Sequence, residues 1–152
     1  MPDYAQRIRA LRLKSGRSES ELADALGVTR QAYADLERFD SEVDSVISIR
    51  QALQLARLLE TDIAGLLGES AEAAPVPIAM VRTALLAQLE RSPDSREALE
   101  DVIDWDIGPF LEASAEWPTV YTLEFLRRLA TLVDLDWRRL LAGLDRAGAS
   151  GT

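Results

Sequence analysis

The stretch ELADALGVTRQAY, residues 21–33, decides the fold of this chain. Leu22 and Leu26 are one helical turn apart, and Gly27 follows them, as glycine does where a helix ends in a left-handed residue. Thr29 is a residue type that caps the start of a helix. The stretch therefore predicts two helices joined by a tight turn.

The apolar spacing is helical on both sides of this turn, and no segment alternates apolar and polar residues as a strand would. Ser18 and Glu21 have the spacing of a capping box at the start of the first helix of the pair. The segment FDSEVDSV, residues 39–46, is expected to be a loop. The spacing predicts an all-α fold, and the helices expected in the first half are 3–14, 18–26, a third from Thr29 through Leu36, 48–59 and 62–67.

Two halves are expected, because GESAEAAPVPIA, residues 68–79, lacks helical periodicity and carries two prolines and a glycine. We expect a first domain over 1–68, a linker over 69–77, a second domain over 78–144 and a flexible tail over 145–152.

The second half repeats the pattern of the first. ISIRQALQLARLLETDIAGLLG (47–68) aligns with YTLEFLRRLATLVDLDWRRLLA (121–142) at an offset of 74 residues, and at an offset of 77 Tyr33 aligns with Phe110. One interpretation is an internal duplication, with a three-residue deletion before the fourth helix. The other is chance similarity between two amphipathic helical segments.

Composition narrows the function classes. The chain has 152 residues, no cysteine and no histidine, and a net charge of −9. Disulfides, thiolate metal sites and histidine chemistry are therefore excluded. Negative charge opposes nucleic-acid binding, but it is unevenly distributed: residues 71–152 carry a balance of −6. Five basic residues crowd the first expected helix and its exit: Arg7, Arg9, Arg12, Lys14 and Arg17.

We expect no enzyme, metal or cofactor. The acidic residues Glu100, Asp101, Asp104 and Asp106 lack the spacing of a calcium loop and fit a helix start with a solvated face better. The sequence has no phosphate-binding glycine loop and no G-x-S-x-G motif. The N-terminus lacks the apolar segment of a signal peptide, and no apolar stretch approaches a membrane span, so we expect a cytoplasmic protein.

Residues 4–68 resemble the Cro/repressor family of helix-turn-helix domains, often called XRE-like. The stretches that carry the resemblance are LRLKSGRSESELADALGVTRQAYADLE (11–37) and SIRQALQLARLLETDIAGLL (48–67). The resemblance implies a five-helix, lambda-repressor-like domain whose third helix lies in the DNA major groove, with dimers on two-fold-related half-sites. With the internal repeat, it implies two tandem domains of this kind.

The resemblance assigns DNA contact to the start of the third helix. Thr29 would place the helix N-terminus at a phosphate, Arg30 suits guanine, and Gln31 suits adenine. Asp35 shares their face and could accept a hydrogen bond from cytosine. The alternative is that all four are solvated residues on a helix surface. The basic residues expected to contact the DNA backbone are Lys14, Arg17 and Arg38.

The sequence keeps one structural ion pair of the family but departs from it at Glu19 and in the segment after the third helix. Arg12 and Glu37 match an ion pair that commonly joins the first and third helices in this family, and we assign them to structure. Glu19, however, stands where the family usually has a glutamine that contacts phosphate. The segment after the third helix is acidic rather than basic, with Asp40, Glu42 and Asp44. These carboxylates would weaken DNA binding.

The second half lacks an equivalent DNA-reading surface. Its counterpart of the third helix is DIGPFLEAS (106–114), and no basic residue occurs between Arg96 and Arg127. Aromatic residues at helical spacing usually belong to a core, but some could form a dimer surface. The candidates for that surface are Trp105, Trp117, Phe125 and Trp137.

The sequence leads to two hypotheses. The first is a transcriptional regulator, a repressor that binds double-stranded DNA as a homodimer joined through residues 78–144. The second is an adaptor or antitoxin-like protein that does not bind DNA and uses its acidic surface to bind a protein partner.

Overall fold

The computed structural model describes residues 3–69, 74–94, 96–97, 100, 108, 117 and 121–150, and the prediction of an all-α fold is confirmed for them. Their helices are α1 (Tyr4–Ser15), α2 (Glu19–Leu26), α3 (Arg30–Leu36), α4 (Asp40–Ser45), α5 (Ile49–Leu58), α6 (Ile63–Leu66), α7 (Ile78–Arg91), α10 (Leu123–Leu132) and α11 (Trp137–Ser150). No helix among them is both long enough and apolar enough for a membrane span.

Polar side chains cap most of these helices where the sequence places them. Ser18 and Thr29 accept hydrogen bonds from the amides of Glu21 and Ala32, at the starts of α2 and α3. The complete reciprocal capping box forms at α5, where Ser48 and Gln51 each bind the other's backbone. Each such cap satisfies an amide that has no partner within its helix.

The prediction of a loop over residues 39–46 was wrong, because Asp40–Ser45 form α4. Val43 is fully buried and anchors this short helix against the core. Asp40 and Glu42 lie in its first turn, where negative charge is favoured by the helix dipole. The first half thus has six helices rather than five.

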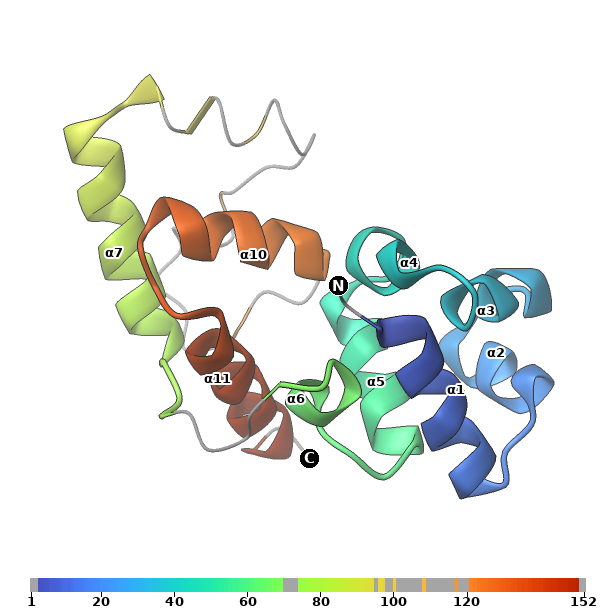
Figure 1. The fold of residues 1–152 in the computed structure, drawn as a ribbon. Helices are drawn as coiled ribbons and strands as arrows, with labels where there is room; N and C mark the ends of the chain where they lie inside the picture. The colour runs from blue at the N-terminus through green and yellow to red at the C-terminus, as the bar shows by residue number, and fades with distance from the viewer. Residues whose placement is uncertain are drawn as a thin grey trace.

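The helices of the first half surround one core. α2 packs against α3 and α5, while α1 packs against α4 and α6. Figure 1 shows α2 and α3 at the end of the molecule farthest from α7. This arrangement leaves the outer side of the α2–α3 pair away from the second half.

The second half contributes α7, α10 and α11. α10 packs against α11 and also against α4 of the first half, and α11 packs against α6. The expected tail over 145–152 was wrong as far as residue 150, because α11 continues through Ser150. Asp145 on this helix accepts hydrogen bonds from the amides of Ile63 (2.7 Å) and Ala64 (3.2 Å).

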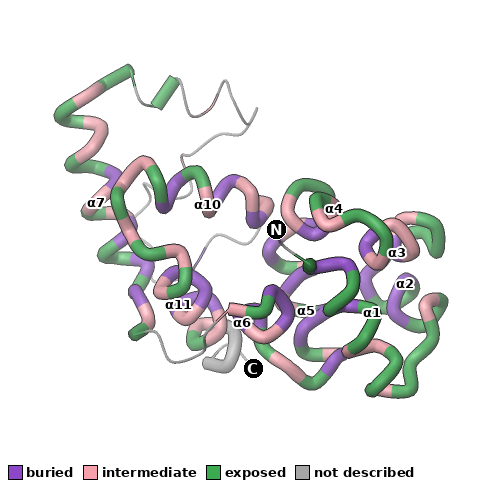
Figure 2. The backbone as a smooth tube through the Cα atoms, in the orientation of Figure 1, coloured by how far each residue is buried: buried purple, intermediate pink, exposed green. Residues whose placement is uncertain are grey.

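The described part of the expected linker also packs against α11. Val76 is buried, and its amide donates to the carbonyl of Arg139 at 3.2 Å. The Arg139 side chain in turn binds the carbonyl of Ala74. A single cluster of buried residues extends through both halves, with buried stretches of α5, α6, α10 and α11 where they meet (Figure 2).

The aromatic residues expected at a dimer surface lie largely inside the chain. Phe125 is fully buried and stacks on Tyr121, with ring centroids 4.3 Å apart. Trp117 is 8% exposed. Trp137 is half-buried beneath the guanidinium of Arg127, and Trp105 lies outside the described residues. Phe125 and Trp117 therefore stabilise the fold and offer little surface to another chain.

Segments 47–68 and 121–142 have the same backbone pattern at equivalent positions. After α5, Glu60 has φ 59°, and after α10 the equivalent Asp134 has φ 56°. The amides of Thr61 and Leu135 donate to the carbonyls of Ala56 and Ala130, each at 2.9 Å. Both helices therefore end in the same Schellman motif, a hydrogen-bonded turn with a left-handed residue.

Candidate nucleic-acid interface

The turn between α2 and α3 fixes the direction of α3. Gly27 ends α2 with φ 71° and ψ 29°, a conformation in which an L side chain would be strained. The amide of Val28 then donates to the carbonyl of Ala23 at 3.0 Å. Gln51 and Gln54 of α5 bind the carbonyls of Leu26 and Ala25 through their side-chain amides. The turn is thus held by its own backbone and by α5.

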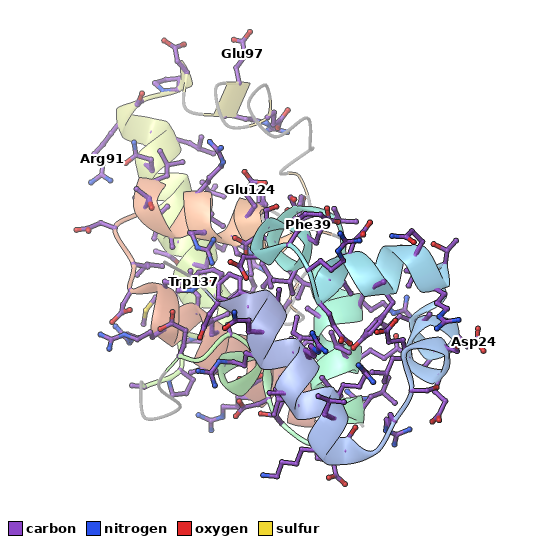
Figure 3. The ribbon with its side chains drawn as sticks, turned by 45° about the vertical axis from the view of Figure 1, so that its right-hand side comes forward. Asp24, Phe39, Arg91, Glu97, Glu124 and Trp137 are labelled. Carbon is purple, nitrogen blue, oxygen red and sulfur yellow. The ribbon has the colours of Figure 1, made fainter. Side chains whose placement is uncertain are left out.

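One face of α3 is anchored and the other is free of the core. Tyr33 and Leu36 are buried, whereas Thr29, Arg30 and Gln31 are exposed. The structure therefore brings together the three residues that the sequence assigned to the start of the reading helix. Asp24 of neighbouring α2 also points into solvent (Figure 3).

Asp35 lies one turn after Gln31 and contacts it directly. The Gln31 side-chain nitrogen donates to the Asp35 carboxylate at 3.0 Å. This bond uses one donor of the amide and restricts the rotamer of Gln31. In this structure Asp35 therefore sets the orientation of the Gln31 side chain.

The ion pair that the resemblance implies is present and is nearly buried. Arg12 donates through Nε and Nη2 to the two carboxylate oxygens of Glu37, at 2.6 and 3.1 Å. Glu19 lies 3.6 Å from the same guanidinium. The departure at Glu19 therefore places a carboxylate beside an internal arginine. Arg12 with its two carboxylates connects α1, α2 and the end of α3.

Burial raises the pKa of Tyr33 well above its ordinary value, and the neighbouring Glu37 carboxylate adds to the shift. The Tyr33 phenol consequently stays neutral, which suits a core residue on the buried face of α3.

The basic residues expected at the DNA backbone fall into two groups. Arg38 follows α3 directly and lies over the ring of Phe39. The Arg17 side chain donates through Nε to the carbonyl of Leu58 at the end of α5. Its backbone carbonyl accepts a hydrogen bond from Arg12, the same residue that binds Glu37 at the end of α3. Exposed Lys14 lies near Arg17 in sequence, at the end of α1.

Two of the three acids after α3 make contacts within the chain. Asp40 accepts a hydrogen bond from the amide of Ala5 at 3.0 Å, at the start of α1. Asp44 forms an ion pair with Arg127 of α10. Burial raises the pKa of Asp44, and Arg127 acts in the opposite direction. These two carboxylates therefore join α4 to α1 and to the second half.

Arg127 was missed by the sequence analysis. Besides Asp44, it binds the Tyr4 hydroxyl at 2.6 Å through Nη2 and stacks over the rings of Tyr4 and Trp137. Trp137 lies in the region where α10, α11 and α1 approach one another (Figure 3). The sequence signal for Arg127 lay in the internal repeat. Leu53 occupies the equivalent position of the first half, so Arg127 is a charged residue where the repeat has an apolar one.

A model of the helix-turn-helix family matches residues 8–66. No curated protein and no solved structure matches the chain. The matched range contains the α2–α3 turn, the exposed start of α3 and the Arg12–Glu37 pair. Families of this kind are DNA-binding and regulatory rather than enzymatic. Residues 8–66, the N-terminal half of the chain, are therefore a helix-turn-helix domain of the XRE type, which supports a DNA-binding regulator.

Proposed function

We propose that this protein is a sequence-specific transcriptional repressor that reads the DNA major groove with α3. The observation that carries the proposal is the division of α3, in which Tyr33 and Leu36 anchor one face while Arg30 and Gln31 are exposed at its start. A reading helix needs both properties, because its base-contacting side chains must project from a backbone that does not move.

The chemistry of these side chains suits base edges. A guanidinium such as that of Arg30 can bind guanine through two hydrogen bonds, and the amide of Gln31 can bind adenine in the same manner. Each such contact is worth about 1–3 kcal/mol of discrimination against a wrong base. Asp35 already holds Gln31 at 3.0 Å, so part of the ordering cost is met before DNA binds.

Charge near α3 is less unfavourable than the sequence suggests. Asp40 and Asp44 are engaged with Ala5 and Arg127, and Glu19 lies beside Arg12. Of these contacts, the pairing of Asp44 with Arg127 offsets a negative charge, whereas Asp40 binds a neutral amide and Glu19 shares Arg12 with Glu37. Arg30 and Arg38 are exposed cations at the start of α3 and just after its end, and we expect DNA affinity to fall with added salt.

Repression requires only that the bound protein occupies a promoter. The proposal therefore does not depend on the homodimer expected through residues 78–144, because the α3 helix of one chain is enough for DNA contact.

The test is binding to the protein's own promoter region, measured by fluorescence anisotropy at low salt. The variant Arg30→Ala/Gln31→Ala should lose about 2–6 kcal/mol of preference for the promoter over an unrelated duplex. Arg9→Ala is the matched control, since it removes an exposed positive charge from α1 and should leave sequence preference unchanged. Equal, non-specific binding by wild type and the double variant would exclude α3 as the reading helix.

The adaptor hypothesis is the second candidate, and exposed Glu21 and Asp24 on α2 favour it. These carboxylates lie on the helix that packs against α3 and could bind a basic protein surface. Affinity capture from the native host separates the two functions. A stoichiometric protein partner without DNA enrichment would support the adaptor, whereas enriched promoter DNA would support the repressor.

A further inference from the structure

Equivalent positions of the two halves contact each other. Ser48 and Thr122, which are 74 residues apart, face each other in an isolated antiparallel bridge. The amide of Ile49 donates to the carbonyl of Tyr121 at 2.7 Å. Ser48 and Thr122 also cap the helices that follow them, α5 and α10. The contact is therefore made by the same structural feature of each half.

This pairing extends to the following elements. α5 (Ile49–Leu58) and α10 (Leu123–Leu132) occupy equivalent positions and end in the same Schellman motif. The next elements, α6 and α11, pack against each other (Figure 1). An antiparallel contact between equivalent segments is the arrangement that a two-fold axis produces in a symmetric dimer. Here both partners belong to one chain.

Other contacts at the same junction are asymmetric. Arg127 of α10 binds Asp44 and Tyr4 of the first half. A second copy of the first half, placed by the same operation, would present Leu53 to Asp44 instead. The half-buried Asp44 carboxylate would then lack its cation, which disfavours that pairing.

Asp145 adds a second asymmetric contact. Asp145 lies on α11, and its carboxylate accepts hydrogen bonds from the amides of Ile63 and Ala64 of α6. The position equivalent to Asp145 in the first half is an alanine, Ala71. A second copy of the first half would therefore bring no carboxylate to these amides.

We propose that the second half is a built-in partner that occupies the place of a second helix-turn-helix domain, so that one chain forms a pseudo-dimer with a single reading helix. This replaces the homodimer expected from the sequence. Its consequence for DNA rests on the proposed function: the target is one asymmetric half-site bound by one chain, instead of an inverted repeat bound by two.

Cysteine cross-linking tests the pairing without DNA, because the chain has no cysteine of its own. In an antiparallel bridge the facing Cβ atoms are close enough for a disulfide in favourable geometry. The full chain with Ser48→Cys and Thr122→Cys should form an intramolecular disulfide on mild oxidation. On non-reducing gels this product keeps the size of one chain and migrates faster than the reduced form.

The single variants identify the competing arrangements. Ser48→Cys alone should give no covalent dimer, since the second half covers this position. A covalent dimer of Ser48→Cys alone would show pairing between two first halves, and one from the double variant would show exchange of halves between chains. Either dimer, or no disulfide in the folded double variant, overturns the proposal.

Loss of the two capping hydroxyls is controlled by Ser48→Ala/Thr122→Ala. Its far-UV circular dichroism and thermal midpoint should equal those of the reduced cysteine variant. If these substitutions prevent folding, cysteines cannot simply be moved to the neighbouring positions Ile47 and Leu123, because both residues are buried in the core. The oligomeric state of wild type by sedimentation velocity then decides, with a single chain expected and a dimer contradicting the proposal.

DNA stoichiometry tests the consequence separately. Footprinting of the promoter region should show one protected half-site without an inverted repeat, and native mass spectrometry should show one chain per site. Two chains on two half-sites about one helical turn apart would overturn the single-site inference. Absence of specific DNA binding would reject the proposed function, while the cross-linking result would still decide the pairing.

Discussion

Segments 47–68 and 121–142 have matching backbones but different surroundings. Both begin at a capping hydroxyl, both form a ten-residue helix, and both end with a left-handed acidic residue, Glu60 or Asp134. In the first segment, Gln51 and Gln54 bind carbonyls at the end of α2 and support the α2–α3 turn. In the second, Phe125 and Arg128 replace them at the equivalent positions.

The comparison shows that local sequence patterns set the backbone, while individual side chains set the partner. Phe125 is buried against Tyr121, where the first half has an amide that completes a capping box. Arg127 replaces Leu53 and connects α10 to three other helices, α1, α4 and α11. Two segments of similar pattern therefore play different roles, one as the support of the α2–α3 turn and the other as a packing partner of the first half.

The largest expected effect comes from truncating equivalent core leucines. Leu55 and Leu129 are both fully buried, so Leu55→Ala and Leu129→Ala should each lower the free energy of unfolding by about 2–5 kcal/mol. All three tryptophans, Trp105, Trp117 and Trp137, lie in the second half. Because the halves share one buried cluster, Leu55→Ala should shift the tryptophan fluorescence transition in urea as far as the circular dichroism transition.

The exposed Leu13 provides the control. Leu13→Ala should change stability by no more than about 0.5 kcal/mol, because its side chain is mostly in solvent already. A fluorescence transition unmoved by Leu55→Ala would mean that the two halves unfold independently.

The next effect concerns the arginine that distinguishes α10 from α5. Arg127→Leu introduces the residue of the equivalent position and leaves Asp44, whose side chain is 16% exposed, without its cation. We expect a loss of about 1–3 kcal/mol in urea denaturation. The matched change Arg128→Leu removes only a surface pair with Glu124 and should cost at most about 0.5 kcal/mol.

Adding Asp44→Leu to Arg127→Leu should restore part of the stability, because no uncompensated charge then remains. Equal stability of Arg127→Leu and Arg128→Leu would remove Arg127 from its role between the halves.

A smaller, pH-dependent effect is expected at Asp145, where α11 meets α6. Burial raises the pKa of Asp145 to about 6 from 3.8, against the opposing effect of two backbone hydrogen bonds. The folded state therefore binds this proton more tightly than the unfolded state does. The resulting stabilisation is complete below about pH 4 and is lost as the pH rises through about 6.

Asp145→Asn cannot titrate, so its thermal midpoint relative to wild type should rise between about pH 4 and 7. Asp136→Asn is the control, because hydrogen bonds from Arg138 lower the pKa of this exposed carboxyl. Its difference from wild type should stay constant over about pH 5–7. A constant difference for Asp145→Asn as well would mean that the carboxyl is not buried at this junction.

The smallest effect should be the same in both halves. Glu60 and Asp134 have positive φ, which costs a residue with a side chain more than it costs glycine. Glu60→Gly and Asp134→Gly should each stabilise the protein by about 0.5–1 kcal/mol, net of the entropy that glycine loses on folding. Leu53→Gly, in the interior of α5, should instead destabilise it. Opposite signs at positions 60 and 134 would show that the two helix ends differ in solution.

Most helices could be predicted because their signals are local. Ser18, Thr29 and Ser48 cap the helices that they precede in sequence, and Gly27 ends α2. α4 was missed because its six residues contain one buried apolar side chain, Val43, which is too short a pattern to distinguish from a loop. The exposed start of α3 was also predictable from local signals, namely the Thr29 cap and the apolar spacing of Tyr33 and Leu36.

The sequence alone determined the helical fold, the α2–α3 turn and the exposure of Arg30 and Gln31, because caps, glycine and apolar spacing act over a few residues. Only the tertiary structure decided where the charges act. Asp40 and Asp44 bind Ala5 and Arg127, which are 35 and 83 residues away in the sequence. An ion pair depends on distance in space, and no local pattern specifies which distant side chain a carboxylate will meet.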